Sequence, residues 1–450
     1  MRRKLYQELL AWKSRSNGSS ALLIEGARRV GKSWLAEEFG RNEYQSYLVI
    51  DFIYAGDDIR QLFKNYIRNL DVFFEKLLNS YGVSLPKRQS LIIFDEVQAF
   101  PKAREAIKAL IADGRYDYIE TGSLVSIKEN TSKILIPSEE ESVTLHPMDF
   151  EEYLWAMGEN NLFEHIKDCF DNLCPMASAI HRRAMDFLRE YMIVGGMPQA
   201  VAEYASSRDL LGADAVKRRI LKLYRDDIAK HTRRYALKVR QLFDDIPSQL
   251  QKHDMKFHPS ALDKNARTRD YEDAIFWLID ALIINPCYRS TEPNVGLKMN
   301  LDRSTAKFYM EDTGLLLSHS FDERTLQAEQ IHRRILCQSI EINKGMFMEN
   351  LVAQMLRANG HKTYFFTQVR TQDRKEEMEI DFLISRPQIG RKHNITPIEV
   401  KSGKRYSTVS LLKFCEKYKD YIGKPYVLHT GDVDIRSNMT FLPIYMAPFL

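Results

Sequence analysis

The sequence predicts an α/β protein whose first part is a parallel sheet with helices on both faces. Residues 1–160 alternate short apolar runs with helical patterns, which is typical of parallel strands joined by helices. A glycine-rich turn follows the first apolar run, and two acids stand at the end of the third. Sheets of this kind bind their ligands at the carboxyl ends of the strands. The expected strands are 21–25, 47–52, 91–95, 116–121 and 142–145.

The composition is that of a folded protein with several domains. A chain of 450 residues exceeds one ordinary core, and 44% hydrophobic with 28% charged residues excludes a disordered chain. The net charge of +4 does not by itself indicate a nucleic-acid partner. The five cysteines form no C-x-x-C pair, no apolar signal core follows the basic start, and the most apolar stretch, 275–284, is too short for a membrane span. We therefore expect a cytoplasmic protein.

The most informative motif directly follows the first expected strand. It fits G-x-x-x-x-G-K-[ST], the phosphate-binding loop of nucleotide triphosphatases. Its glycines let the backbone wrap around phosphates, and the helix that follows adds the positive end of its dipole. We expect Lys32 to reach the β- and γ-phosphates of ATP and Ser33 to bind Mg²⁺ through its hydroxyl. The predicted nucleotide-binding residues are Gly26, Ala27, Arg28, Arg29, Val30, Gly31, Lys32 and Ser33.

Two acids at the end of the 91–95 strand support the same prediction of a nucleotide site. Asp95 ends a continuous apolar run, as expected for a buried strand, and Glu96 follows it. We expect Asp95 to hold Mg²⁺ through water and Glu96 to orient or deprotonate the attacking water. The next strand ends near Thr121, so Thr121 or Ser123 is a candidate for sensing the γ-phosphate. A capped strand–helix turn is the alternative for that segment.

A basic segment lies in the middle of the chain. Between residues 217 and 240 there are ten Lys or Arg residues and two acids. The apolar residues among them keep helical spacing, so we expect an amphipathic helix with a basic face. Such a face suits contact with nucleic-acid phosphates, and a solvated face that packs on the rest of the protein is the alternative. The candidate contact residues are Lys217, Arg218, Arg219 and Lys222.

A second set of chemical groups lies in the last hundred residues. Asp381 is on an expected strand at 379–384, and Glu399 and Lys401 share one face of a later strand because strand side chains alternate. Glu349 is on the expected helix 345–358. The pattern resembles the Asp…Glu-x-Lys signature of the restriction-endonuclease-like fold. In that chemistry Asp381, Glu399 and Glu349 hold Mg²⁺, and Lys401 stabilises the transition state or lowers the pKa of the attacking water. A salt-bridge cluster that no longer cuts is the alternative.

Together with the segments at 148–154, 195–198 and 307–316, these motifs resemble the prokaryotic AAA-type ATPases that carry a C-terminal domain of formerly unknown function, DUF4143. The resemblance spans nearly the whole chain and implies a winged-helix module in its second half. One departure is visible, because residues 136–141 lack the arginine that many relatives have near this point. No arginine finger is therefore assigned, and the candidates are Arg28, Arg29, Arg182 and Arg183.

The expected domains are a P-loop AAA-type ATPase domain at 1–160, a helical lid at 161–207, a winged-helix-like basic segment at 208–325, a connector at 326–344 and a restriction-endonuclease-like domain at 345–450. The expected function is ATP hydrolysis coupled to the other two parts. We expect ATP and Mg²⁺ as cofactors, DNA as a partner, and a homo-oligomer or a protein partner. The alternative is a nucleotide-gated regulatory module whose nuclease-like domain is inactive and serves as a docking surface.

Overall fold

The computed structural model describes residues 1–122, 138–231, 235–294, 296–321, 344–368, 377–385, 394–403, 405–436 and 438–450. The chain divides into two compact units, residues 1–146 with 280–282, and residues 147–279 with 283–450. Ser123 and nearly all of the predicted connector lie outside the described residues. In the described part of the chain, no helix combines the length and the apolar character that a bilayer span requires.

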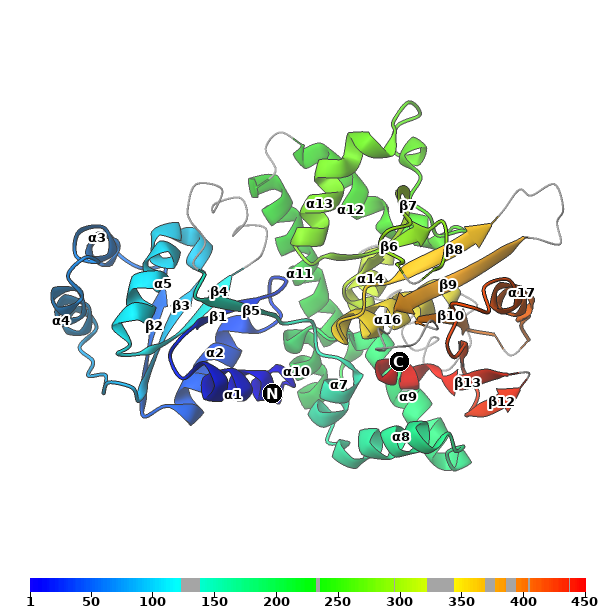
Figure 1. The fold of residues 1–450 in the computed structure, drawn as a ribbon, viewed down its shortest axis with the longest axis horizontal. Helices are drawn as coiled ribbons and strands as arrows, with labels where there is room; N and C mark the ends of the chain where they lie inside the picture. The colour runs from blue at the N-terminus through cyan, green and yellow to red at the C-terminus, as the bar shows by residue number, and fades with distance from the viewer. Residues whose placement is uncertain are drawn as a thin grey trace. The chain divides into compact units, whose positions relative to one another are not determined.

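The first unit contains the predicted parallel sheet with its covering helices, which confirms the fold class (Figure 1). All of its strand pairs are parallel, in the order β2-β3-β4-β1-β5. Each of the five expected strands has an observed counterpart close to its expected position. The strands are β1 Ala21–Glu25, β2 Ser46–Asp51, β3 Ser90–Asp95, β4 Asp117–Gly122 and β5 Glu140–Thr144, and the helices are α1 Leu5–Ser16, α2 Lys32–Glu43, α3 Asp57–Asn65, α4 Leu70–Tyr81 and α5 Pro101–Asp113.

The register of this sheet brings the ends of three strands to one edge. Ile24 of β1 lies beside Thr121 of β4, and Phe94 of β3 lies beside Glu120 of β4. Strand β4 therefore lies between the strand that precedes the glycine-rich loop and the strand that ends in Asp95. Every residue of β3 and β4 is buried, as expected for strands covered on both faces.

The second unit begins with a run of helices. Three sequence segments that are far apart in the chain meet among them. The backbone N–H of Gly196 donates to Asp312 Oδ2 at 2.5 Å, and its carbonyl accepts from the Met148 N–H at 2.7 Å. A side chain at Gly196 would lie 2.1 Å from the Met148 carbonyl oxygen. The helices are α7 Phe150–Ala156, α8 Asn160–Asn172, α9 Ser178–Val194, α10 Pro198–Ser207, α11 Leu210–His231, α12 Ala236–Gln251, α13 Glu272–Asp280, α14 Thr313–Ser320, α16 Lys344–Ala358 and α17 Val409–Lys417.

The second unit also contains an eight-stranded mixed sheet (Figure 1). Its order is β12-β13-β11-β10-β9-β8-β6-β7, and Phe366 and Phe414 pack together between this sheet and α17. The strands are β6 Ile284–Ser290, β7 Leu301–Met310, β8 Tyr364–Gln368, β9 Met378–Ser385, β10 Ile395–Lys401, β11 Tyr426–His429, β12 Asp434–Arg436 and β13 Met439–Pro443.

This sheet crosses a boundary that the sequence placed between two domains. Strands β6 and β7 come from the segment predicted as a separate winged-helix-like part, yet β6 pairs with β8 and extends the sheet of the C-terminal domain. The sequence could not indicate this, because strand pairing across an intervening helix leaves no local pattern. Residues 345–450 alone would lack two strands of their sheet.

A buried carboxyl group lies in the core of the first unit. Glu120 of β4 is fully buried, and burial, together with a hydrogen bond to Glu140, raises its pKa well above the usual value. Glu140 in turn accepts two hydrogen bonds from the Arg104 guanidinium, at 2.8 and 2.6 Å. A raised pKa means that the folded protein keeps this proton at pH values where the unfolded chain has already released it.

This carboxyl predicts a pH dependence of stability. Because the folded state holds a proton that the unfolded state releases above about pH 4.5, the contribution of Glu120 to the free energy of unfolding falls as pH rises toward its raised pKa. Glu120→Gln keeps the shape of the side chain and removes its titration. Urea titrations between about pH 5 and 9 should therefore show that the free energy of unfolding falls less steeply in Glu120→Gln than in the wild type. Exposed Glu75→Gln is the matched control. Equal slopes for wild type and Glu120→Gln would contradict this assignment.

Candidate functional site

The loop between β1 and α2 has the backbone shape that its glycines predict. Gly31 has a φ of 94°, in the left-handed region that costs a glycine little. At Gly26 the constraint is space, because a Cβ atom there would lie 2.5 Å from the carbonyl oxygen of Leu145. Helix α2 begins at Lys32, so its first N–H groups belong to this loop. The loop can therefore wrap closely around phosphate groups.

Lys32 extends its buried side chain across the loop. Its ammonium donates to the carbonyl oxygens of Gly26 and Ala27, each at 3.0 Å. Burial lowers the pKa of the Lys32 ammonium, while the carboxylates of Glu96 and Asp95 raise it. The structure thus brings the predicted lysine close to both predicted acids, although they are about sixty residues apart in the chain.

Asp95 connects three elements of the site. Its Oδ1 atom accepts a hydrogen bond from the Ser33 hydroxyl at 2.7 Å, and the same oxygen accepts one from the Thr121 hydroxyl. Thr121 is fully buried, and its hydroxyl oxygen also accepts the backbone N–H of Glu96 at 3.2 Å. Thr121 is therefore engaged with the two acids, which identifies it as a positioning residue for them.

Glu96 lies where the chain turns away from β3. Its φ of 52° places a residue other than glycine in the left-handed region, which is uncommon and typical of functional sites. The Gln98 side-chain amide donates to one carboxylate oxygen, Glu96 Oε2. No pattern in the sequence indicates this role of Gln98, because a polar residue after a strand end is usually a solvated turn residue.

The groups around Asp95 suit a magnesium ion. Mg²⁺ prefers oxygen ligands and keeps several of its waters, so one hydroxyl and one carboxylate are sufficient protein ligands when a nucleotide supplies the rest. Ser33 and Asp95 provide such a pair. Bound there, the ion would supply positive charge that stabilises the charge developing on the phosphates.

The C-terminal residues that the sequence singled out also come together. Lys401 Nζ lies 3.0 Å from Glu399 Oε2, and Asp381 Oδ2 accepts the backbone N–H of Val400 at 2.8 Å. Burial raises the pKa of Glu399 to about 7, although Lys401 opposes this shift. Helix α16 contributes Glu349, whose pKa burial likewise raises to about 7.

Strand β7 adds a lysine for which the sequence analysis assigned no role. Lys307 is buried, and its ammonium lies 3.6 Å from Glu349 Oε2 and 3.6 Å from Glu379 Oε1. Tyr309, two residues along the same strand, donates its hydroxyl to Glu349 Oε2 at 3.0 Å. Although burial opposes it, the carboxylates of Glu349 and Asp381 raise the pKa of the Lys307 ammonium, which is therefore charged. A lysine directly before the apolar end of a strand, Phe308 to Met310, was the available signal.

This arrangement does not fit the metal ion that the sequence predicts for Glu349, Asp381 and Glu399. The ammonium of Lys307 lies near Glu349 and that of Lys401 lies near Glu399, so each of these two carboxylates already has a cationic partner. Among the described residues, no group of three His, Cys, Asp or Glu side chains is placed to hold a metal ion. A cation site needs uncompensated oxygen ligands that converge on one point. We therefore derive no metal-dependent step from this cluster.

Comparison with protein families assigns the first unit. Residues 18–154 match the family model described as an AAA domain. The chain carries an AAA domain. Residues 344–447 match a domain of unknown function, DUF4143, as predicted, and residues 185–325 match another, DUF8612. No curated protein matches the sequence.

Two solved structures show distant similarity to the chain. The structure of C. elegans PCH-2 is 13% identical, with a TM-score of 0.28 over 48% of this chain and 68% of that chain. The Pyrococcus furiosus Hef helicase domain is 12% identical, with a TM-score of 0.19 over 95% of this chain and 89% of that chain. These scores are too low to transfer an arrangement or a role to the AAA domain.

The four basic candidates on α11 have different environments. Lys217 is fully buried and donates to the carbonyl oxygens of Ile193 at 2.6 Å and Gly314 at 3.3 Å, so it cannot contact a nucleic acid. The Arg218 guanidinium donates to Asp214 Oδ2 at 2.7 Å. Arg219 and Lys222 are exposed. Helical periodicity alone could not separate these residues, because the helix is covered on more than one side.

The arginine candidates remain without an assigned role. Arg28 and Arg29 are exposed on the loop of the AAA domain. Arg182 and Arg183 are exposed on α9, and Arg183 pairs with Glu159 at 2.5 Å.

The buried lysine predicts a large effect on stability. Lys307→Met keeps most of the side-chain length but removes the charge that compensates Glu349 and Glu379. We expect the free energy of unfolding of the full chain to fall by about 3–5 kcal/mol, as for other buried pairs that lose one partner. Chemical denaturation measures this loss. Exposed Lys419→Met should change stability by less than about 0.5 kcal/mol.

Thermal unfolding with Mn²⁺ tests whether the Lys307 ammonium takes the place of a metal ion at this cluster or lies beside one. Both proteins compared carry Asp95→Asn, which weakens metal binding in the AAA domain. Mn²⁺ should raise the melting temperature of the protein with Lys307→Met and leave that of the protein with Lys307 intact unchanged, because only the first has uncompensated carboxylates. Stabilisation of the Lys307 protein that disappears in Asp381→Ala would show that a metal and Lys307 occupy the cluster together.

Proposed function

We propose that the AAA domain binds ATP with Mg²⁺ and hydrolyses it. The observation that carries this proposal is the 2.7 Å hydrogen bond between Ser33 of the loop and Asp95 of β3, because it joins the phosphate-binding element to the acid that would hold the ion. The match of residues 18–154 to an AAA domain supports the same conclusion. The chemistry needs little from the protein beyond positioning and charge.

Each residue then has a distinct part. The loop N–H groups and the Lys32 ammonium hold the phosphate oxygens, and Lys32 leaves the carbonyls of Gly26 and Ala27 to do so. Ser33 and Asp95 hold Mg²⁺. One carboxylate oxygen of Glu96 is engaged by Gln98, and the other takes a proton from the attacking water.

Two substitutions separate binding from hydrolysis. Glu96→Gln should bind ATP normally and hydrolyse it at least ~10²-fold more slowly, as expected when a general base is lost. Lys32→Ala should lose nucleotide binding, because its positive charge compensates the phosphates. Phosphate release and ATP affinity are measured for both, with exposed Glu105→Gln of α5 as the matched control. Wild-type ATP turnover in either variant would contradict the role that we propose for the substituted residue.

We further propose that ATP turnover acts on a second unit that contacts DNA through α11. Arg219 and Lys222 are exposed and one helical turn apart, and neither has an ion pair among the residues that the structure describes. Such a pair can contact two neighbouring phosphates. The cluster around Lys307 favours a C-terminal domain that does not cut and instead serves as a docking surface.

The proposed DNA contact predicts a change in salt dependence. Double-stranded DNA affinity should fall steeply with salt concentration, and Arg219→Glu combined with Lys222→Glu should reduce the slope of log K against log salt by about two. Exposed Lys419→Glu, with one charge reversed away from α11, should leave the slope unchanged. An unchanged slope in the double variant would assign this face of α11 to solvent.

A further inference from the structure

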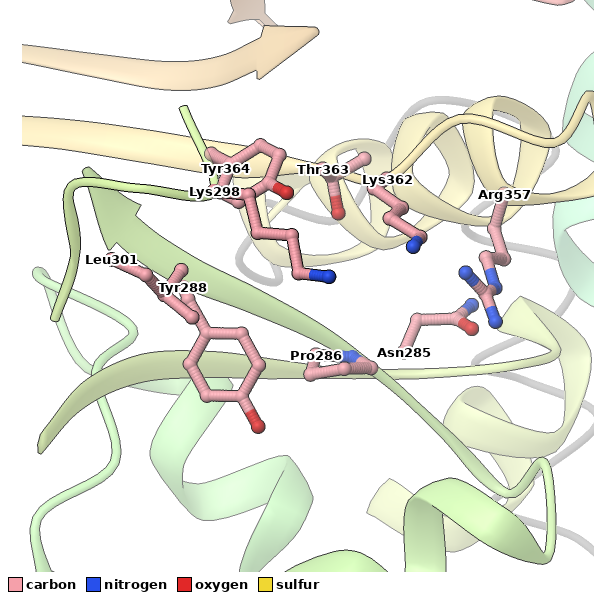
Figure 2. A pocket seen from close by; sticks show the side chains of 9 residues that line it. All are labelled: Asn285, Pro286, Tyr288, Lys298, Leu301, Arg357, Lys362, Thr363 and Tyr364. Carbon is pink, nitrogen blue, oxygen red and sulfur yellow. The ribbon is translucent and has the colours of Figure 1, made fainter. Parts of the chain in front are cut away.

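A cavity of about 180 Å³ lies in the second unit where the pairing of β6 with β8 is incomplete. The two strands pair only at Tyr288 with Tyr364 and at Arg289 with Phe365. The residues that precede these pairs diverge, and the space between them is the cavity (Figure 2). It is several times the share of liquid volume of one water, about 30 Å³. Its lining comprises Asn285, Pro286, Tyr288, Lys298, Leu301, Arg357, Lys362, Thr363 and Tyr364.

The lining carries three positive charges and no negative one. Lys298 comes from the β6–β7 connection, Arg357 from the end of α16, and Lys362 from the segment before β8. Figure 2 shows their charged ends turned toward the same space. In the described part of the chain none of the three has an ion-pair partner. Bringing three cations together without a counter-charge is unfavourable, and an anion removes that cost.

Two buried donors in the lining also lack acceptors. Asn285 is only 3% exposed, and its Nδ2 atom has no hydrogen-bond acceptor among the described residues. The same is true of Arg357 Nε. Buried donors are nearly always paired in folded proteins, so each unpaired one needs an explanation. An oxyanion in the cavity would accept from both.

We propose that this cavity, the phosphate pocket, binds the phosphate group of a small phosphorylated ligand. A phosphate monoester carries about −1.5 to −2 charges at neutral pH and three free oxygens, which matches three cations and an amide better than a singly charged carboxylate does. The planar guanidinium of Arg357 can bind two phosphate oxygens at once. Tyr288, Leu301 and Tyr364 form an uncharged wall for the rest of the ligand.

The phosphate pocket and the proposed ATP site share no residues and belong to different units of the chain. All of its lining comes from residues 285–364, whereas the loop and the acids of the AAA domain lie before residue 122. The proposal therefore goes beyond ATP hydrolysis and does not depend on it.

The test uses the full chain with Lys32→Ala, so that the AAA domain contributes no phosphate binding. Isothermal titration calorimetry with inorganic phosphate and with adenosine monophosphate should give saturable binding of one equivalent. Lys298→Gln combined with Lys362→Gln should raise Kd at least tenfold for both probes. These two lysines are exposed, so the variant should fold, and thermal unfolding checks this. The matched control is exposed Lys419→Gln, with unchanged Kd.

The alternatives give different results. Adenosine, which lacks the phosphate, should bind neither protein. Absence of phosphate and adenosine monophosphate binding, or equal binding in the double variant, would overturn the proposal. DNA binding that weakens in the double variant while neither small probe binds would overturn it in favour of a nucleic-acid backbone contact.

Discussion

A single carboxylate oxygen, Asp95 Oδ1, accepts hydrogen bonds from two hydroxyls that lie on different elements. Ser33 comes from the helix after β1 and Thr121 from the end of β4, so this oxygen ties together the ends of three neighbouring strands. The contact requires parallel strands in one particular register, because a shift of any strand would move one hydroxyl out of reach. The geometry of the loop, of Lys32 and of Glu96 all depends on that alignment.

The two units use the same residue types in different ways. In the AAA domain two hydroxyls donate to Asp95 Oδ1, and the Lys32 ammonium lies near the same carboxylate. In the second unit the partners of Glu349 and Glu399 include the ammonium groups of Lys307 and Lys401. Buried carboxylates must be compensated in either case. An ammonium on a strand does so permanently, whereas a metal does so only when it is bound.

Strand β6 borders two regions that differ in charge. Burial raises the pKa of the Cys287 thiol and the nearby Lys307 ammonium opposes this shift, while Asn285 lines the phosphate pocket. One short strand thus borders both a cluster of acids paired with lysines and a cavity with excess positive charge. The acids Glu349 and Glu379 of the neighbouring cluster are engaged with Lys307, not with the cations of the pocket. This leaves the pocket available for an external anion.

The sequence alone determined the parallel sheet of the AAA domain and most of the proposed nucleotide site. Glycines, a lysine and a strand ending in two acids have local patterns, because each reflects a turn, a helix start or a buried strand within a few residues. The shared face of Glu399 and Lys401 and the nearness of Asp381 were also predictable from strand alternation, whereas Glu349 joins them from helix α16. Only the tertiary structure placed Lys307 among these acids, buried Lys217 under its neighbours, and joined β6 to β8. These outcomes depend on contacts between segments far apart in the chain, which leave no local pattern in the residues that make them.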